Sequence, residues 1–217
     1  AHTAVNTRVD KLPSILDFSF GRAVIDVVAG VAGTDELAKL FRADPLYEGG
    51  APAALRLPTF LGNHDAGRFP ALMKMFGYKG GDDELLRRDM LGHAMLLTLR
   101  GVPTIYSGDE QGFVGKGGDQ DARQDMFASK VAVYNDNKLV GTNATTAQSN
   151  FDIAHPLYKL IRELADMRKG NSALRRGSTV FRAGEKGPGL LAFSRTLDGR
   201  EVLVAVNTST KTIERNV

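Results

Sequence analysis

Three residues that can do chemistry stand side by side after the apolar segment 57–61: Asn63, His64 and Asp65. A carboxylate in such a place can hold a ligand hydroxyl, stabilise developing positive charge or act as a base. A neutral imidazole can donate a hydrogen bond to a ligand oxygen. The same residue types also end strands for purely structural reasons, through hydrogen bonds from side chain to backbone. Both interpretations stay open for this group alone.

A second polar group, Ser107, Asp109 and Glu110, follows the apolar segment 102–106. In parallel α/β folds, ligand chemistry collects at the carboxyl ends of the strands. Two polar groups at equivalent strand ends should therefore open onto one face. Together they make a binding site as plausible as a structural explanation.

The elements that position both groups form a strand–helix–strand unit. Residues 57–61 and 102–106 predict two short buried strands. Residues 82–100 predict a long helix, whose broad apolar face suits packing against a sheet. Such a unit implies that the two strands are parallel.

Other segments upstream and downstream of this unit are predicted to be helices and loops. Upstream, the pattern predicts helices over 20–30 and 34–42, the second capped by Thr34, and a loop over the Pro-, Gly- and Ala-rich segment 45–56. Downstream, a long polar loop over 107–150 leads to a helix over 156–170 that has proline at its first position.

After residue 170 the hydrophobic period changes to two, which indicates strands. Three such strands are predicted, over 178–183, 190–196 and 201–207, and Asp198-Gly199 is a hairpin signal between the last two. We therefore expect an α/β part over 1–170 and an antiparallel β part over 171–217.

The composition excludes several classes of protein. Of the 217 residues, 42% are hydrophobic and 24% are charged, which is typical of a soluble chain with one substantial core. The net charge of +3 comes from scattered Lys and Arg, so nucleic acid is not an expected partner. No apolar run is long enough for a membrane span, and the lack of cysteine excludes disulfides and thiolate metal sites. The compartment stays unknown, with a secreted or periplasmic location slightly favoured over a cytoplasmic one.

Three aspartates of the polar loop, Asp119, Asp121 and Asp125, could suggest calcium, which binds carboxylate oxygens. Their spacing lacks the closing Glu of an EF-hand loop, and loop aspartates are more often solvated. We therefore expect no metal and no cofactor, with calcium as a minor alternative in a longer parent protein. Of the histidines, His93 is expected to be packed or half-exposed on its helix, without a function, and His155 to help begin a helix.

Five segments, in order along the chain, resemble the α-amylase superfamily, the glycoside hydrolases of family 13. FLGNHDAGRF at 60–69 resembles its fourth conserved region, and GVPTIYSGDEQG at 101–112 resembles its eighth barrel strand and the loop after it. GGDQDARQDMF at 117–127 resembles the Gly-Asp loop that follows. LPSILDFSF at 12–20 resembles the entry to the sixth barrel helix, and 155–177 resembles the eighth helix and the passage to the C-domain.

The resemblance implies a fold and a wider chain context. Residues 1–170 would be the C-terminal portion of a catalytic (β/α)₈ TIM barrel, and 171–217 the beginning of an antiparallel β-sandwich C-domain, incomplete in this chain. A barrel takes about 250 residues, and only its last two strands have counterparts here. We therefore expect a C-terminal fragment that needs the missing N-terminal half of the barrel.

The resemblance also implies roles for the first polar group. Asp65 would be the third catalytic carboxylate, which holds sugar hydroxyls and stabilises the transition state. His64 would bind the same sugar. Asn63 would order the strand end and count among the substrate-binding residues, while Arg68 would orient the loop.

In the second group, Asp109 and Glu110 would line the cleft and contact substrate, or hold their own loop. Some relatives bind chloride through an arginine on the eighth strand. The corresponding segment here reads Val102-Pro103-Thr104, so we expect no chloride.

The expected function is that of a retaining α-glycosidase, which hydrolyses or transfers α-glucosidic bonds in α-glucans or oligosaccharides. Such enzymes need a nucleophile and an acid/base whose carboxyls lie ~5–5.5 Å apart, and this family carries them on its fourth and fifth strands. The Arg-x-Asp at Arg8-Val9-Asp10 lacks the preceding Gly and apolar strand, and no other Arg-x-Asp of the sequence has that Gly. Both carboxylates therefore lack counterparts here, and the fragment alone is expected to be inactive.

Two alternatives remain at this point. A non-catalytic member of the family could bind carbohydrate or act as a scaffold, although such a protein has no need of the His64–Asp65 pair. A self-contained small hydrolytic domain would need its own nucleophile, and the sequence has no G-x-S-x-G elbow.

Overall fold

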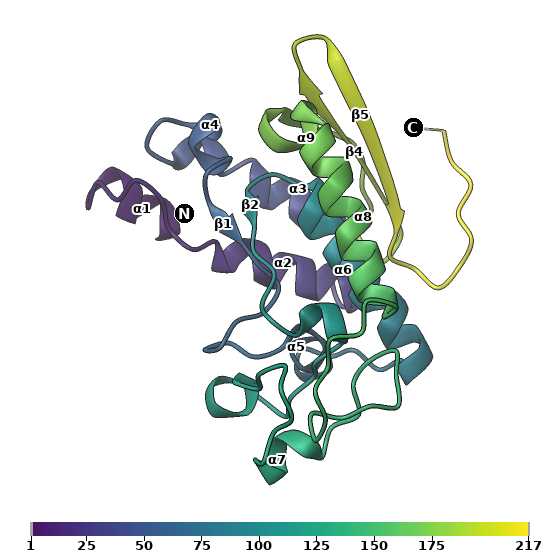
Figure 1. Ribbon diagram of the computed structural model, residues 1–217. Helices are drawn as coiled ribbons and strands as arrows, with labels where there is room; N and C mark the ends of the chain where they lie inside the picture. Colours follow the sequence, from purple (N-terminus) through teal and green to yellow (C-terminus); the bar gives the residue numbers. More distant parts are fainter. Residues whose placement is uncertain (1, 217) are drawn as a thin grey trace.

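The structure is a computed structural model that describes residues 2–216. Figure 1 shows helices around a short parallel strand pair, with an antiparallel sheet at the upper right. The helices are α1 (His2–Arg8), α2 (Phe18–Val28), α3 (Asp35–Phe41), α4 (Ala51–Ala54), α5 (Phe69–Met75), α6 (Asp82–Thr98), α7 (Ala132–Asn135), α8 (Pro156–Gly170) and α9 (Ser172–Arg176). Short 3₁₀ helices are η1 (Asp44–Leu46), η2 (Asp109–Gln111) and η3 (Asp119–Ala122). The strands are β1 (Pro58–Thr59), β2 (Val102–Pro103), β3 (Ser178–Ala183), β4 (Leu190–Leu197) and β5 (Arg200–Asn207).

β1 and β2 pair in parallel, as the strand–helix–strand pattern predicts, with Pro58 opposite Val102 and Thr59 opposite Pro103. The predicted strands over 57–61 and 102–106 are too long, because the ladder covers only two residues of each. A proline has no backbone N–H to donate, so each strand includes one residue that cannot contribute a donor to a sheet. The prediction of a buried strand is also wrong for β2, since Val102 is 50% exposed.

The crossover between the two strands contains α5 as well as the predicted long helix α6.

The segment 45–56 is not the uninterrupted loop that its composition predicts. It contains η1 and α4, because Pro45 and Pro52 stand in the first turn of each, where proline favours a helix start. Thr34 precedes α3 as predicted, but its hydroxyl donates to the carbonyl of Leu190 at 2.8 Å and does not cap the helix.

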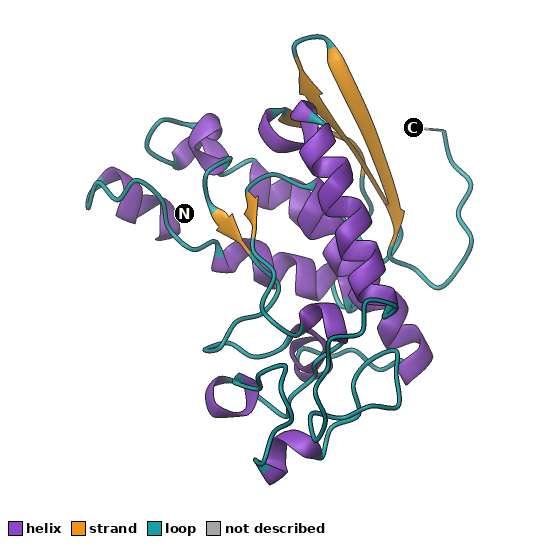
Figure 2. Ribbon diagram, in the orientation of Figure 1, coloured by secondary structure: helices purple, strands orange, loops and turns teal. Residues whose placement is uncertain are grey.

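One hydrophobic core joins the helices to the antiparallel sheet. Val24 of α2, Met95 of α6 and Phe193 of β4 are fully buried within the same cluster. β4 is the central strand of the order β3–β4–β5, and Figure 2 shows this sheet beside α9. The predicted antiparallel strands are confirmed, but the short helix α9 precedes them, so the change from helix to strand comes after Arg176 and not after residue 170. The division into domains over 1–170 and 171–217 stays a prediction.

Two buried arginines from later elements hold the carboxyl end of α6. Arg168 of α8 donates to the carbonyls of Leu97 at 2.9 Å and Gly101 at 2.6 Å. Arg195 of β4 donates to the carbonyl of Thr98 at 3.0 Å. The last carbonyls of a helix have no partner within it, so these guanidinium groups complete its hydrogen bonding. Burial lowers the pKa of Arg168 and of Arg195 to about 10, so both remain charged at neutral pH.

The loops that follow β1 and β2 run to the same end of the molecule, where the long polar loop also lies (Figure 1). Both polar groups found in the sequence are therefore on one side of the fold. Among the helices of residues 2–216, none is both long and apolar enough to cross a membrane.

An apolar surface is exposed beside β1 and β2. Leu12, Leu16 and Phe18 are each about half exposed and line one surface with Pro58. Apolar surface of this kind favours association. We predict that the isolated chain self-associates, which light scattering coupled to size-exclusion chromatography will detect.

A matched pair of variants locates the surface responsible. Phe18→Ser should reduce self-association, because Phe18 is 48% exposed beside β1. Phe127→Ser should leave it unchanged, although Phe127 is 67% exposed, because it lies in the polar loop. A monomeric wild-type chain with one sharp cooperative unfolding transition would contradict the prediction.

Candidate functional site

The loop after β1 is closed on itself by Asn63. Its side-chain oxygen accepts the N–H groups of Asp65 at 2.9 Å and Ala66 at 2.7 Å. Its backbone N–H and carbonyl exchange hydrogen bonds with Gly67 at 3.1 and 3.0 Å. Asn63 thus shapes the turn from which the next two side chains project, a contact set that agrees with its expected ordering role.

His64 and Asp65 project outward from this turn, and their side chains are 55% and 65% exposed. The Nε2 atom of His64 lies 3.3 Å from Oδ1 of Asp65. An imidazole and a carboxylate so placed can hold two neighbouring hydroxyls of one ligand, because both are rich in hydrogen-bonding atoms and open to solvent.

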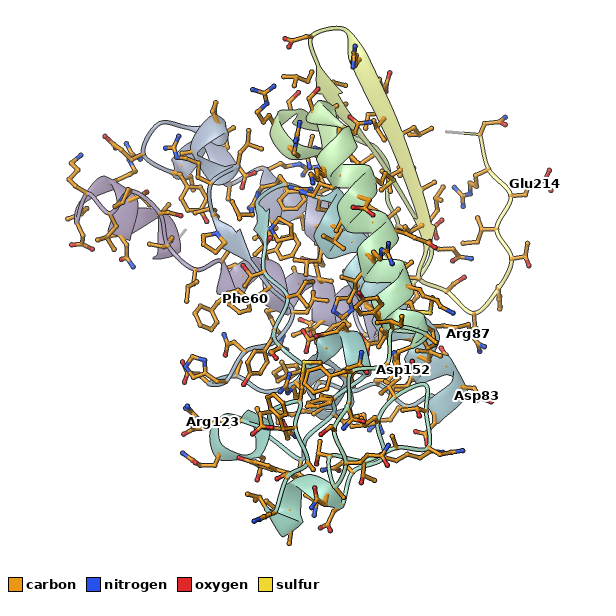
Figure 3. The ribbon with its side chains drawn as sticks, in the orientation of Figure 1. Phe60, Asp83, Arg87, Arg123, Asp152 and Glu214 are labelled. Carbon is orange, nitrogen blue, oxygen red and sulfur yellow. The ribbon has the colours of Figure 1, made fainter. Side chains whose placement is uncertain are left out.

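Arg123 is a site residue that the sequence did not single out. Its guanidinium pairs with Asp119 at 2.6 Å and reaches Oδ1 of Asp65 at 3.5 Å. The hydrogen bond with Asp119, helped by the charge of Asp65, raises the pKa of Arg123. Figure 3 labels Arg123 at the end of the molecule where the loop after β1 lies. Two signals in the sequence could have identified this pair: its spacing of four residues, and its place in the segment 117–127 that resembles the Gly-Asp loop.

Backbone contacts also fasten the loop after β2 to the loop that carries Asp65. The N–H of Asp119 donates to the carbonyl of Asp65 at 3.2 Å. A Cβ atom on Gly118 would lie 3.0 Å from the carbonyl oxygen of Ala66 and 3.2 Å from that of Asp65. Only glycine allows this approach without a shift of the two backbones.

Arg68 is fully buried beneath both loops. Its guanidinium donates to the carbonyl of Ser107 at 2.5 Å, to Oδ1 of Asp109 at 3.4 Å, and to the side chain and carbonyl of Gln124 at 3.1 and 2.9 Å. It also lies over the ring of Tyr106, 3.9 Å from the centroid. Burial lowers the pKa of Arg68, against the opposing effect of Asp109. These contacts are those of a residue that orients loops.

Asp109 and Glu110 occupy different environments. Asp109 is 5% exposed, and its carboxylate accepts the N–H of Tyr106 at 3.3 Å as well as facing Arg68. Glu110 accepts the N–H of Gly108 at 3.0 Å and lines a cavity of about 360 Å³. Of the two roles expected for this pair, Asp109 has the contacts of the loop-holding one, whereas Glu110 borders open space.

The aspartates considered for calcium do not converge. Asp119 faces Arg123, and the carboxylate of Asp125 accepts the N–H of Phe127 at 2.8 Å. Within residues 2–216, no group of three or more His, Asp or Glu side chains is arranged to hold a metal ion.

Comparison with known proteins places this geometry in a family context. A sequence model described as the alpha-amylase catalytic domain matches residues 47–177. The α-amylase of Streptomyces lividans is 42% identical over 207 residues, which are 94% of this chain and 22% of that protein. The cyclomaltodextrin glucanotransferase of Bacillus sp. (strain 1-1) is 30% identical over 198 residues, 90% of this chain and 23% of that protein.

Solved structures show the same similarity. An Anoxybacillus α-amylase superposes with a TM-score of 0.73 at 22% identity, over 97% of this chain and 39% of its own. A γ-cyclomaltodextrin glucanotransferase from alkalophilic Bacillus clarkii superposes with a TM-score of 0.68 at 28% identity, over 97% of this chain and 26% of its own. The chain thus spans less than a quarter of the length of the two relatives matched by sequence.

The close approach at Gly118 gives a test of the loop contact. In the full-length protein, Gly118→Ala should lower the free energy of unfolding of this region by about 1–3 kcal/mol, the range for overpacking a tight contact. Gly187→Ala is the matched control, because a Cβ atom there meets nothing within 4 Å. Thermal unfolding compares the two, and equal melting temperatures would show that the loops do not depend on this contact.

Proposed function

Because the chain belongs to the α-amylase family, we propose that its longer parent protein cleaves or transfers α-glucosidic bonds in α-glucans or related oligosaccharides. In this proposal, residues 1–170 are the C-terminal portion of the catalytic (β/α)₈ barrel, and 171–217 begin a β-sandwich domain. The observation that carries it is the exposed His64–Asp65 pair, which projects from the carboxyl end of a parallel strand within the matched segment.

Asp65 is assigned the role of the carboxylate that grips the sugar at the point of cleavage. Glycoside cleavage passes through an oxocarbenium-like transition state in which the sugar ring is distorted, and hydrogen bonds to ring hydroxyls strengthen as it forms. Asn63 holds the backbone N–H of Asp65, and Arg123 lies 3.5 Å from one of its carboxylate oxygens, so both the backbone and the side chain of Asp65 have a partner. Fixed polar groups stabilise a transition state because they need no reorganisation during the reaction.

His64 shares this ligand. Its Nε2 atom is 3.3 Å from Asp65, so a sugar hydroxyl bound by one side chain is within reach of the other. Asn63 acts through the turn, and Arg68 and Asp109 act from below the loops. Glu110, at the edge of a cavity, is assigned a contact with a more distant part of the substrate.

The nucleophile and the acid/base are assigned to upstream sequence of the parent protein. A retaining mechanism needs two carboxyls about 5–5.5 Å apart in addition to Asp65. Asp119 shares the guanidinium of Arg123 with Asp65, and its carboxylate is already paired with that guanidinium at 2.6 Å. Relatives named as an amylase and as a glucanotransferase both match, so the proposal covers hydrolysis and transfer.

The role of Asp65 can be tested in the full-length protein. Asp65→Asn should lower kcat on a nitrophenyl maltoside by about 10²–10³-fold, the loss that follows removal of one transition-state hydrogen-bonding group. Asp83→Asn is the matched control, since Asp83 is an exposed carboxylate at the start of α6, on the opposite side of the view from Arg123 in Figure 3. An Asp65→Asn variant with wild-type kcat would refute the assignment.

The isolated 217-residue chain should not turn over the same maltoside, because it is proposed to lack the nucleophile and the acid/base. The assay compares the purified chain with its Asp65→Asn variant. Turnover by the chain that disappears in the variant would show that the catalytic centre is complete within these residues.

A further inference from the structure

A buried pair of side chains on α6 takes no part in the sugar-binding group described above. Asp89 and His93 are one helical turn apart, and each is 1% exposed. The Nδ1 atom of His93 lies 3.0 Å from Oδ1 of Asp89 and 3.0 Å from the carbonyl oxygen of the same residue. The Phe69 ring lies nearly perpendicular to the imidazole, at a centroid distance of 6.0 Å.

The other ring nitrogen of His93 faces the strand-end loops. Nε2 is 3.8 Å from Oδ2 of Asp109 and has no hydrogen-bond partner within the part of the chain that the structure describes. Asp109 in turn faces Arg68 at 3.4 Å, and Arg68 holds the carbonyl of Ser107. A row of alternating charges thus runs from the interior of α6 to the loops after β1 and β2.

The charges of this row balance only when His93 is protonated. Burial alone would lower the pKa of His93, but the two nearby carboxylates, Asp109 and Asp89, outweigh it and raise the pKa to about 10. Burial raises the pKa of Asp89, and His93 opposes that change. We assign the proton to the imidazole, because it faces two carboxylates. The other titratable groups that act on the row are His155, which acts on Asp89, and Tyr106 and Glu110, which act on Arg68.

We propose that His93 is a positioning residue for the sugar-binding loops, in which its imidazolium bridges Asp89 and Asp109 and so keeps Asp109 in place beneath Arg68. This inference rests on the proposed function, because the loops so held are those that carry His64 and Asp65. Loss of the bridge leaves Asp109 buried with one cation fewer, and a buried carboxylate short of partners moves toward water. The carbonyl of Ser107 and the turn at Arg68 would move with it.

The full-length protein provides the test, with kcat and KM measured on a nitrophenyl maltoside. His93→Gln keeps the size and one N–H but removes the charge, and we expect kcat to fall about tenfold or more, since small displacements of a catalytic group have effects of that order. KM should change less than twofold.

His155→Gln is the matched control. His155 is also buried, at 3% exposure, but its ring nitrogens contact the carbonyl of Val140 and the N–H of Leu157, and it enters none of the ion pairs within residues 2–216. The His155→Gln variant should be less stable than the wild-type protein but keep its kcat. If both variants lower kcat to the same extent, or if His93→Gln leaves kcat unchanged, the proposal is overturned.

A double-mutant cycle separates positioning from general loss of stability. If His93 acts through Asp109, then His93→Gln should lower kcat in the wild-type protein but cause little further loss in an Asp109→Asn background. Independent, additive losses of kcat in the cycle would overturn the proposal. The cycle compares the kcat values of the four proteins. Because a partly unfolded variant would lower the apparent kcat, each value is divided by the concentration of active protein, measured by titration.

The protonation of His93 is measured in the wild-type protein, and a variant serves only to assign the signal. In protein labelled with ¹⁵N-histidine, the His93 ring should remain protonated at pH 8, with the signal identified by its loss in His93→Gln. Because its folded pKa is raised, the stability it contributes is full below the unfolded value of about 6.5. That stability is lost as pH rises toward 10. A neutral His93 ring at pH 7 overturns the proposal, whereas wild-type protein inactive on α-glucans refutes the proposed function and leaves this measurement valid.

Discussion

The arrangement at the strand ends depends on the burial of one charge, the guanidinium of Arg68. Removing a charge from water costs several kcal/mol unless hydrogen bonds and an opposite charge compensate for the loss. Asp109, the carbonyl of Ser107 and two groups of Gln124 provide that compensation. Neither loop can move away without leaving this charge unsatisfied. The segment that carries Asp65 is therefore held by electrostatics from below as well as by its own turn.

Sequence patterns succeeded where the hydrogen bonds of an element are local. Pro156 and Gly170 bound α8 as expected, and the apolar face of α6 identified a long helix between parallel strands. The patterns failed for η1 and α4, where richness in Pro, Gly and Ala was taken for a loop although proline in a first turn starts a helix. They also gave strands that were too long, because ladder length depends on a distant partner.

The candidate site was only half visible in the sequence for a similar reason. His64 and Asp65 could be recognised because their chemistry lies in adjacent positions after an apolar segment. Arg123 could not, since it is 58 residues away from Asp65 and is brought there by the fold of a long loop. The sequence suggested that Arg68 orients a loop, but its full burial depends on residues near positions 107 and 124. His93 was expected to be packed or half-exposed, and its two carboxylate neighbours are set by α6 and η2 together.

The prolines of the parallel pair have a further consequence for the edges of this small sheet. The N–H groups of Val102 and Thr104 donate toward β1, so the intervening Pro103 faces away from it. Pro58 likewise faces away from β2, and its carbonyl already accepts the N–H of Asp17 at 2.9 Å. Each outward position therefore lacks a donor, and proline at an edge hinders the addition of another strand. In the barrel proposed for the parent protein, the strands on either side must therefore pair with these edges through carbonyl groups and through N–H groups other than those of the two prolines.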